Sequence, residues 1–207
     1  EPIVLAGQEG DLSRLDAMDA VTALEQQAFH LPPAFVAQQL VVEINHRRRE
    51  LADVRVRRAI AHAIDRDFVV RTIFRGFATV SQGPVPRNDR VFHAADLAGW
   101  GFNPTRANAL LDEAGYARGA DGVRFRLRLL PAPFFNETRQ FGDYLRQALA
   151  VVGIDATIVA NDTPAHLKAV YTDHAFDLAV GSPVYRGAPA ISTTVLFQSG
   201  LPAGVPV

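Results

Sequence analysis

The 207-residue sequence contains no cysteine, so it can form neither a disulfide nor a thiolate zinc site. It also lacks any apolar run near the length of about 18 residues that a membrane-spanning helix needs. A net charge of −1 leaves little of the clustered positive charge that nucleic-acid binding requires. These absences argue against a membrane-spanning protein, a nucleic-acid-binding protein and a cysteine-dependent enzyme.

Catalytic motifs are missing too. The chain has no Gly-x-Ser-x-Gly elbow and no Walker loop, and its histidines do not show the spacing of a zinc site. We interpret His166 and His174 as solvent-facing polar residues. An enzyme that pairs Ser182 or Ser192 with a histidine stays open as a third class of function, but we predict no catalytic residue, no metal and no cofactor.

What the sequence does contain is typical of a globular protein, with 48% hydrophobic and 21% charged residues. Its length allows one large domain or two small ones. The basic run from His46 to Arg49 is offset by nearby acidic residues, so it should form a solvated face. The chain opens on Glu1 and ends in an apolar tail, and we interpret it as a piece of a longer polypeptide.

The stretch from Asp53 to Asp65 predicts an amphipathic helix around which the chain is organised. Its apolar residues recur at helical spacing: Val56, Ala59, Ile60, Ala63 and Ile64. Asp53 is expected to cap the helix, because its carboxylate can accept from the free amides of the first turn. Asp65 should end this helix and begin the next.

The same stretch resembles a family signature. Asn45, a gap of seven residues, Asp53 and the run from Val54 to Arg66 are similar to the signature of the family 5 extracellular solute-binding proteins, the peptide, oligopeptide and nickel receptors of ABC importers. A second, independent match runs from Asn103-Pro104 to Gly115-Tyr116. The resemblance covers roughly residues 3–200.

Alternating strand and helix patterns predict an α/β fold. Strands are expected at 3–6, 40–45, 78–80, 124–130, 154–160 and 176–181, and helices at 19–28, 53–65, 67–75, 103–114, 136–152 and 164–173. The resemblance implies a periplasmic-binding-protein-like type II lobe with a mixed sheet flanked by helices. It also implies three segments: 1–39 leading from another lobe, 40–200 as the ligand-binding lobe, truncated at its C-terminal end, and 201–207 as a tail.

Two strand ends could hold a ligand, because ligands in open α/β sheets bind where strands end and helices begin. The first is the loop before the long helix, with Phe134, Phe135 and Asn136 as candidates. The two rings offer apolar contact, and Asn136 with the first helical amides can donate to an anionic group. The alternative is that the rings pack into the core and Asn136 is only a cap.

The second candidate is the loop Gly181–Pro189, with Gly181, Ser182, Tyr185 and Arg186. In peptide-binding relatives a tryptophan and an aspartate stand where this chain has Ser182 and Tyr185, and the aspartate pairs with the peptide amino terminus. An unpaired ammonium in a closed cleft is costly, so free-amine peptides become a less certain cargo. Tyr185 and Arg186 could instead hold an anionic, neutral or sugar-like ligand. A plain surface turn is the alternative.

The resemblance implies a hinged clamp that closes on a peptide-like or other small solute and delivers it to a membrane permease. It further implies a periplasmic or membrane-anchored extracellular location and a monomer, and the net charge of −1 predicts no nucleic-acid partner. With half a cleft, this chain alone should bind its solute weakly or not at all. The same fold also serves as the ligand-sensing domain of transcription regulators, and that alternative stays open.

Overall fold

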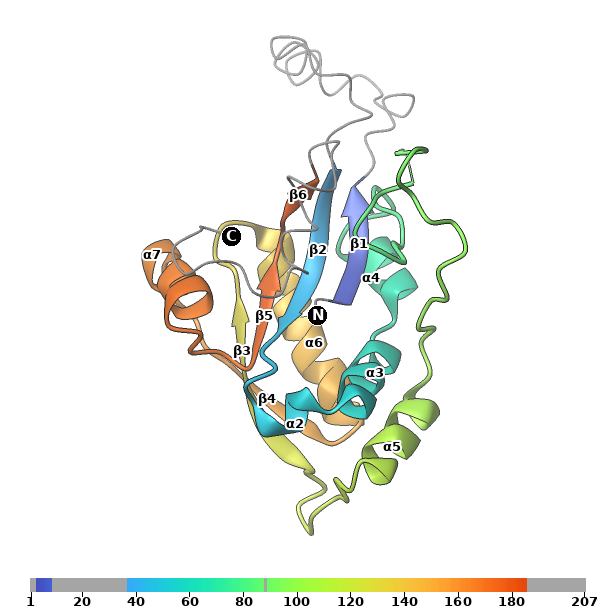
Figure 1. The fold of residues 1–207 in the computed structure, drawn as a ribbon. Helices are drawn as coiled ribbons and strands as arrows, with labels where there is room; N and C mark the ends of the chain where they lie inside the picture. Colours follow the sequence, from blue (N-terminus) through green and yellow to red (C-terminus); the bar gives the residue numbers. More distant parts are fainter. Residues whose placement is uncertain (1–2, 9–36, 88, 186–207) are drawn as a thin grey trace.

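The computed structural model describes residues 3–8, 37–87 and 89–185. A six-stranded mixed sheet lies at its centre, in the order β1-β2-β5-β3-β4, with β6 also paired to β2 (Figure 1). The strands are β1 Ile3–Gln8, β2 Ala37–Ile44, β3 Phe125–Pro131, β4 Ile154–Ile158, β5 Leu178–Gly181 and β6 Val184–Tyr185. Strand β2 is antiparallel to β1, β5 and β6, whereas β5, β3 and β4 are parallel. This is the mixed sheet that the resemblance implied.

Strands β5 and β6 form one ladder along β2. The register runs from Ile44 opposite Leu178 to Ala37 opposite Tyr185 without a shift. Between the two strands, the Gln39 amide donates to the Pro183 carbonyl over 2.9 Å. We expected a loop from Gly181 to Pro189, but the chain continues along β2 as far as Tyr185, so this prediction is wrong for residues 181–185. Residues 186–189 lie outside the described part of the chain.

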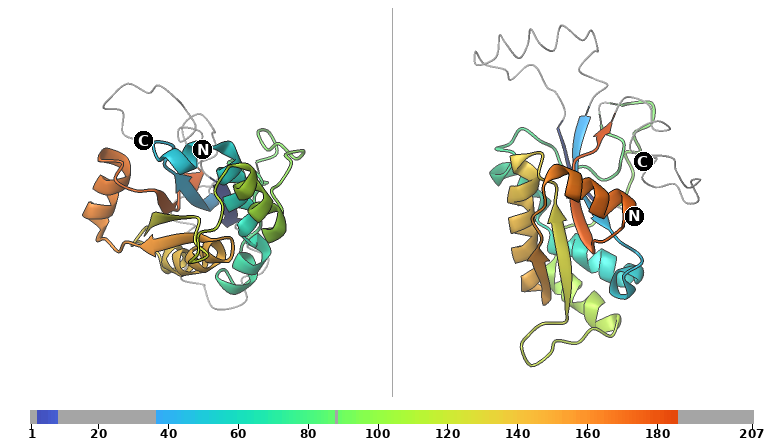
Figure 2. Two further views of the ribbon diagram at one scale, coloured as in Figure 1. Left: turned by 90° about the horizontal axis from the view of Figure 1, so that it is seen from below. Right: turned by 90° about the vertical axis from the view of Figure 1, so that its left-hand side faces the viewer.

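Helices cover both faces of the sheet. They are α2 Arg49–Ala52, α3 Val54–Ala63, α4 Arg66–Thr72, α5 Pro104–Glu113, α6 Asn136–Val151 and α7 Thr163–Leu167, which the π-helical turn η3 Lys168–Thr172 continues. Figure 2 shows α6 running along one face of the sheet, with α7 set apart from it. Alternate residues of β3 point to different cores. Leu129 belongs to the large core with α3, α5 and α6, and Leu130 packs with Val170 of η3.

The helix starts follow the predicted caps. The Asp53 carboxylate accepts from the Arg55 amide over 2.8 Å, and the Asp65 carboxylate accepts from the Phe68 amide over 2.8 Å. Asn103 caps α5 in the same way, with Pro104 as its first residue. The whole predicted stripe of α3, together with Ile64, is buried. The central amphipathic helix is thus confirmed, and the basic run 46–49 is solvent-exposed as expected.

Some expected elements differ. The helix expected at 67–75 ends at Thr72, because the chain turns there and Gly76 takes a positive φ of 84°. Only an isolated bridge at Thr79 represents the strand expected at 78–80. The helix expected at 164–173 widens into η3 after Leu167. The helix expected at 19–28 lies outside the described residues, and no helix within the described ranges is long and apolar enough to span a bilayer.

The basic face expected on β3 is only partly exposed. Arg126 and Arg128 are open to solvent, but the Arg124 side chain is 3% exposed. Its guanidinium donates to the Val152 carbonyl over 3.0 Å and pairs with Asp112 over 2.5 Å. Arg124 therefore connects the ends of α5 and α6 instead of facing water.

Candidate functional site

The two strand ends predicted to hold a ligand lie side by side. Strands β3 and β5 are parallel neighbours, with Pro131 opposite Val180, so both chains leave the sheet at the same edge. Phe135, from the loop after β3, and Ser182, directly after β5, line one pocket of about 220 Å³. The remaining lining residues are Gln38 and Leu40 of β2, Phe74 after α4, and Glu137 and Thr138 of α6.

The phenylalanines of the first loop do not pack into the core. Phe134 is 42% exposed and Phe135 is 40% exposed. Phe135 lines the pocket, whereas the Phe134 ring makes an edge contact with His166 at a centroid distance of 5.6 Å. Asn136 is the first residue of α6 and does not cap it. Its side-chain oxygen accepts from Arg139 over 2.8 Å.

The residues of the second loop divide between the two faces of the sheet. Ser182 directly follows Gly181, which pairs with Val41, and it lines the pocket together with Leu40. Gly181 and Tyr185 alternate with it and point to the other face. Arg186 falls outside the described residues. The four candidates from this loop therefore do not form one cluster, because strand pairing with β2 continues through Tyr185.

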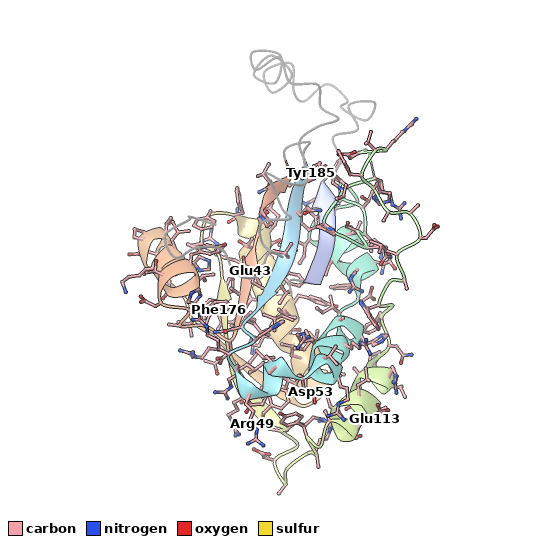
Figure 3. All side chains as sticks on the ribbon, viewed as in Figure 1. Glu43, Arg49, Asp53, Glu113, Phe176 and Tyr185 are labelled. Carbon is pink, nitrogen blue, oxygen red and sulfur yellow. The ribbon has the colours of Figure 1, made fainter. Side chains whose placement is uncertain are left out.

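Tyr185 is fully buried, and its hydroxyl donates to the carboxylate of Asp89. Figure 3 shows Tyr185 at the upper end of the sheet, far from Asp53. This hydrogen bond, together with the amides of Phe92 and Val91, holds the pKa of Asp89 below its usual range. Burial, and next the bond to Asp89, raises the pKa of Tyr185. By resemblance, peptide-binding relatives have an aspartate at the position of Tyr185. In this chain the carboxylate of Asp89 lies next to that position, on the Tyr185 hydroxyl.

Gly181 makes room for another carboxylate. A Cβ added at Gly181 would clash with the side-chain oxygen of Glu43 on β2. That oxygen accepts from the Tyr171 hydroxyl over 3.1 Å, and burial raises the pKa of Glu43. The glycine is thus explained by close packing on the sheet face opposite the pocket.

Sequence reasoning missed five of the lining residues. Glu137 and Thr138 directly follow the predicted loop, so the first turn of the long helix was the available signal. The pairing of β2 with β5 brings Gln38 and Leu40 to the pocket. Phe74 reaches it because segments far apart in the chain pack together. Neither relationship leaves a pattern in one sequence.

His166 corrects a second expectation. It is 2% exposed, not solvent-facing, and its Nδ1 has no hydrogen-bond partner among the residues that the structure describes. Burial lowers the pKa of His166, whose ring packs against Phe134. No group of three or more His, Asp or Glu side chains among the described residues is placed to hold a metal ion.

Comparison with solved structures gives the fold. The oligopeptide-binding protein AppA of Bacillus subtilis, in complex with a nonapeptide, has a TM-score of 0.65 at 20% identity, covering 72% of this chain and 31% of that chain. The periplasmic binding protein DppA of Helicobacter pylori, in complex with the peptide STSA, has a TM-score of 0.64 at 23% identity. The match covers 78% of this chain and 30% of that chain. The fold is that of the periplasmic binding proteins.

Sequence comparison gives the family. The glutathione-binding protein GsiB of Shigella flexneri is 31% identical over 124 residues, which are 60% of this chain and 23% of that relative. The chain thus matches less than a quarter of that curated relative. The family described as "Bacterial extracellular solute-binding proteins, family 5 Middle" matches residues 5–203. The chain belongs to the family 5 bacterial extracellular solute-binding proteins.

Proposed function

We propose that the chain forms most of one lobe of the solute-binding component of an ABC importer. The lobe, expected at residues 40–200, would close with a second lobe over a small solute, and the complex would deliver it to a membrane permease. The observation that carries this proposal is the pocket where β3 and β5 end, lined by Phe135 and Ser182. It lies where ligands bind in open α/β sheets.

The proposed cargo is a peptide-like or other small solute. Relatives named for glutathione and structural neighbours holding peptides support this class of cargo. The pocket also has suitable chemistry. Rings and an aliphatic side chain form one part of its wall, and amide, hydroxyl and carboxylate groups form the rest. We expect a monomeric protein in the periplasm or anchored outside the membrane, with no nucleic-acid partner and no catalytic step.

The test is a thermal-shift screen of the full-length protein against di- and oligopeptides, sugars, amino-acid conjugates and metal chelates. A solute that binds only the folded state raises the melting temperature, and about 100-fold excess over Kd stabilises by about 2.7 kcal/mol. We expect at least one class to give a saturable shift, which titration calorimetry then measures. No shift from any member of the panel would contradict the proposed function.

A further inference from the structure

Three polar side chains of the pocket have unused hydrogen-bonding capacity. The amide of Gln38, the hydroxyl of Ser182 and the carboxylate of Glu137 all line it, and none forms a hydrogen bond or ion pair within the described part of the chain. The Thr138 hydroxyl differs, because it lies 2.6 Å from the Ala132 carbonyl and 2.8 Å from the Phe135 carbonyl. Within the described residues, these three lining groups are therefore available to a solute.

Glu137 is the charged member of this lining. It is half-buried, and no arginine or lysine of the described residues lies within ion-pair distance of it. A half-buried carboxylate has lost part of its hydration, and an apolar wall of Leu40, Phe74 and Phe135 cannot replace it. A cation that entered the pocket would supply the missing partner.

We propose that Glu137 binds the primary ammonium group of the solute and makes the pocket selective for amine-bearing solutes. This inference rests on the proposed function and names the class of solute. An ammonium has three donors, and the Gln38 and Ser182 oxygens offer neutral acceptors near the carboxylate. A hydrogen bond that involves a charged group is stronger than a neutral one. An N-acetylated solute would leave Glu137 unpaired in the closed cleft.

Glu137 also lies in the first turn of α6, where a carboxylate stabilises the positive end of the helix. That role is structural and does not depend on the solute. The two roles separate in experiment, because helix stabilisation appears in the melting temperature without solute, whereas amine recognition appears in the ratio of two affinities.

The experiment compares free-amine and N-acetylated forms of the same di- to tetrapeptides by calorimetry on the full-length protein. We expect the wild type to prefer the free amine at least tenfold, and Glu137→Gln to reduce this ratio to about twofold or less. Glu137→Asp keeps the charge and should keep most of the preference. Asp143→Asn removes an exposed carboxylate from the same helix and should leave the ratio unchanged.

Equal wild-type affinity for both forms, or a preference that survives in Glu137→Gln, would overturn this inference and leave the proposed function standing. A wild type that binds only sugars or anionic solutes would also overturn the inference about Glu137 and leave the proposed function standing. A wild type that binds no solute of any class would overturn both.

Discussion

Tyr185 shows how one distant contact decides the role of a residue. Its position suggested a ring and hydroxyl facing a ligand, but the hydroxyl donates to Asp89, 96 residues earlier in the chain. The Asp89 carboxylate also accepts from the Val91 and Phe92 amides, each over 3.1 Å. The pair fastens the irregular segment around Asp89 to the end of the sheet, so Tyr185 is held away from solvent.

Replacing Tyr185 by phenylalanine keeps the ring and removes the hydroxyl. We expect Tyr185→Phe to lower the free energy of unfolding at pH 7 by about 1–3 kcal/mol, because a buried carboxylate loses a donor. The folded-state pKa of Asp89 is lowered. Its contribution is therefore fully present above the unfolded-state pKa of about 3.9 and is lost as pH falls through the folded-state value.

Urea denaturation at pH 7 and below pH 4 measures this effect. The difference between wild type and Tyr185→Phe should shrink at the lower pH. Tyr116→Phe serves as the control, since no described residue bonds to the Tyr116 hydroxyl, and it should cost little at either pH. A difference that stays constant with pH would show that the Asp89 charge is not involved.

At the scale of elements, the contact between α6 and β3 positions the pocket. Gly142 of α6 is buried against Pro131, the last residue of β3. A Cβ at Gly142 would come within 3.0 Å of the proline Cβ and closer still to its Cγ. The glycine therefore sets how closely the first turns of α6 approach the end of the sheet.

Gly142→Ala tests this contact, because two effects oppose each other. Alanine favours a helix over glycine by about 1 kcal/mol. The clash with a rigid proline ring costs about 1–3 kcal/mol, as overpacking of a core usually does. We expect the clash to dominate, so the variant should melt at a lower temperature in calorimetry.

The matched control is Gln147→Ala, at an exposed position of the same helix, which should change stability by at most about 0.5 kcal/mol. A Gly142→Ala variant more stable than wild type would mean that α6 shifts away from Pro131 without cost. The affinity for solute, measured alongside, would then report whether the pocket has moved.

The predicted elements were correct where local chemistry decides them. Asp53, Asp65 and Asn103 cap helices through their own first turns, so a single sequence shows them. The pairing of β2 with β5 and β6 joins residues more than a hundred positions apart, and no local pattern encodes it. That pairing sends Ser182 and Tyr185 to different faces, which is why the candidate site was only partly predicted.

At the scale of the whole molecule, the two cores share one sheet. The main core uses Leu129 and Leu178, while the smaller core uses their neighbours Leu130 and Ala179. Neither core can separate without breaking strands that the other needs. We therefore expect one cooperative unfolding transition for the part of the chain that the structure describes.

Two probes can check this cooperativity. The single tryptophan, Trp100, lies beside α3, with the Arg58 guanidinium 5.1 Å from its ring, and its fluorescence should change at the same denaturant concentration as the far-ultraviolet circular dichroism. Leu130→Ala, in the smaller core, should lower both midpoints together and cost about 2–5 kcal/mol. Separate midpoints would mean that the α7 side unfolds independently.

The family signature and the pocket occupy different ends of the molecule. Asp53 and Glu113, near the two matched motifs, lie at the lower end, whereas Tyr185 and the strand ends lie at the upper end (Figure 3). The signature residues build the core through α3 and α5. They therefore identify the family without contributing a lining residue to the pocket.

The make-up of the pocket wall has an evolutionary consequence. Gln38, Phe135, Glu137 and Ser182 line the pocket but do not belong to either buried core. Mutations at these four positions can change the chemistry of the pocket wall while the buried cores of the sheet and its helices stay intact. Under the proposed function, related proteins can therefore diverge in the solute they take up through substitutions at a few codons, without compensating substitutions in the core.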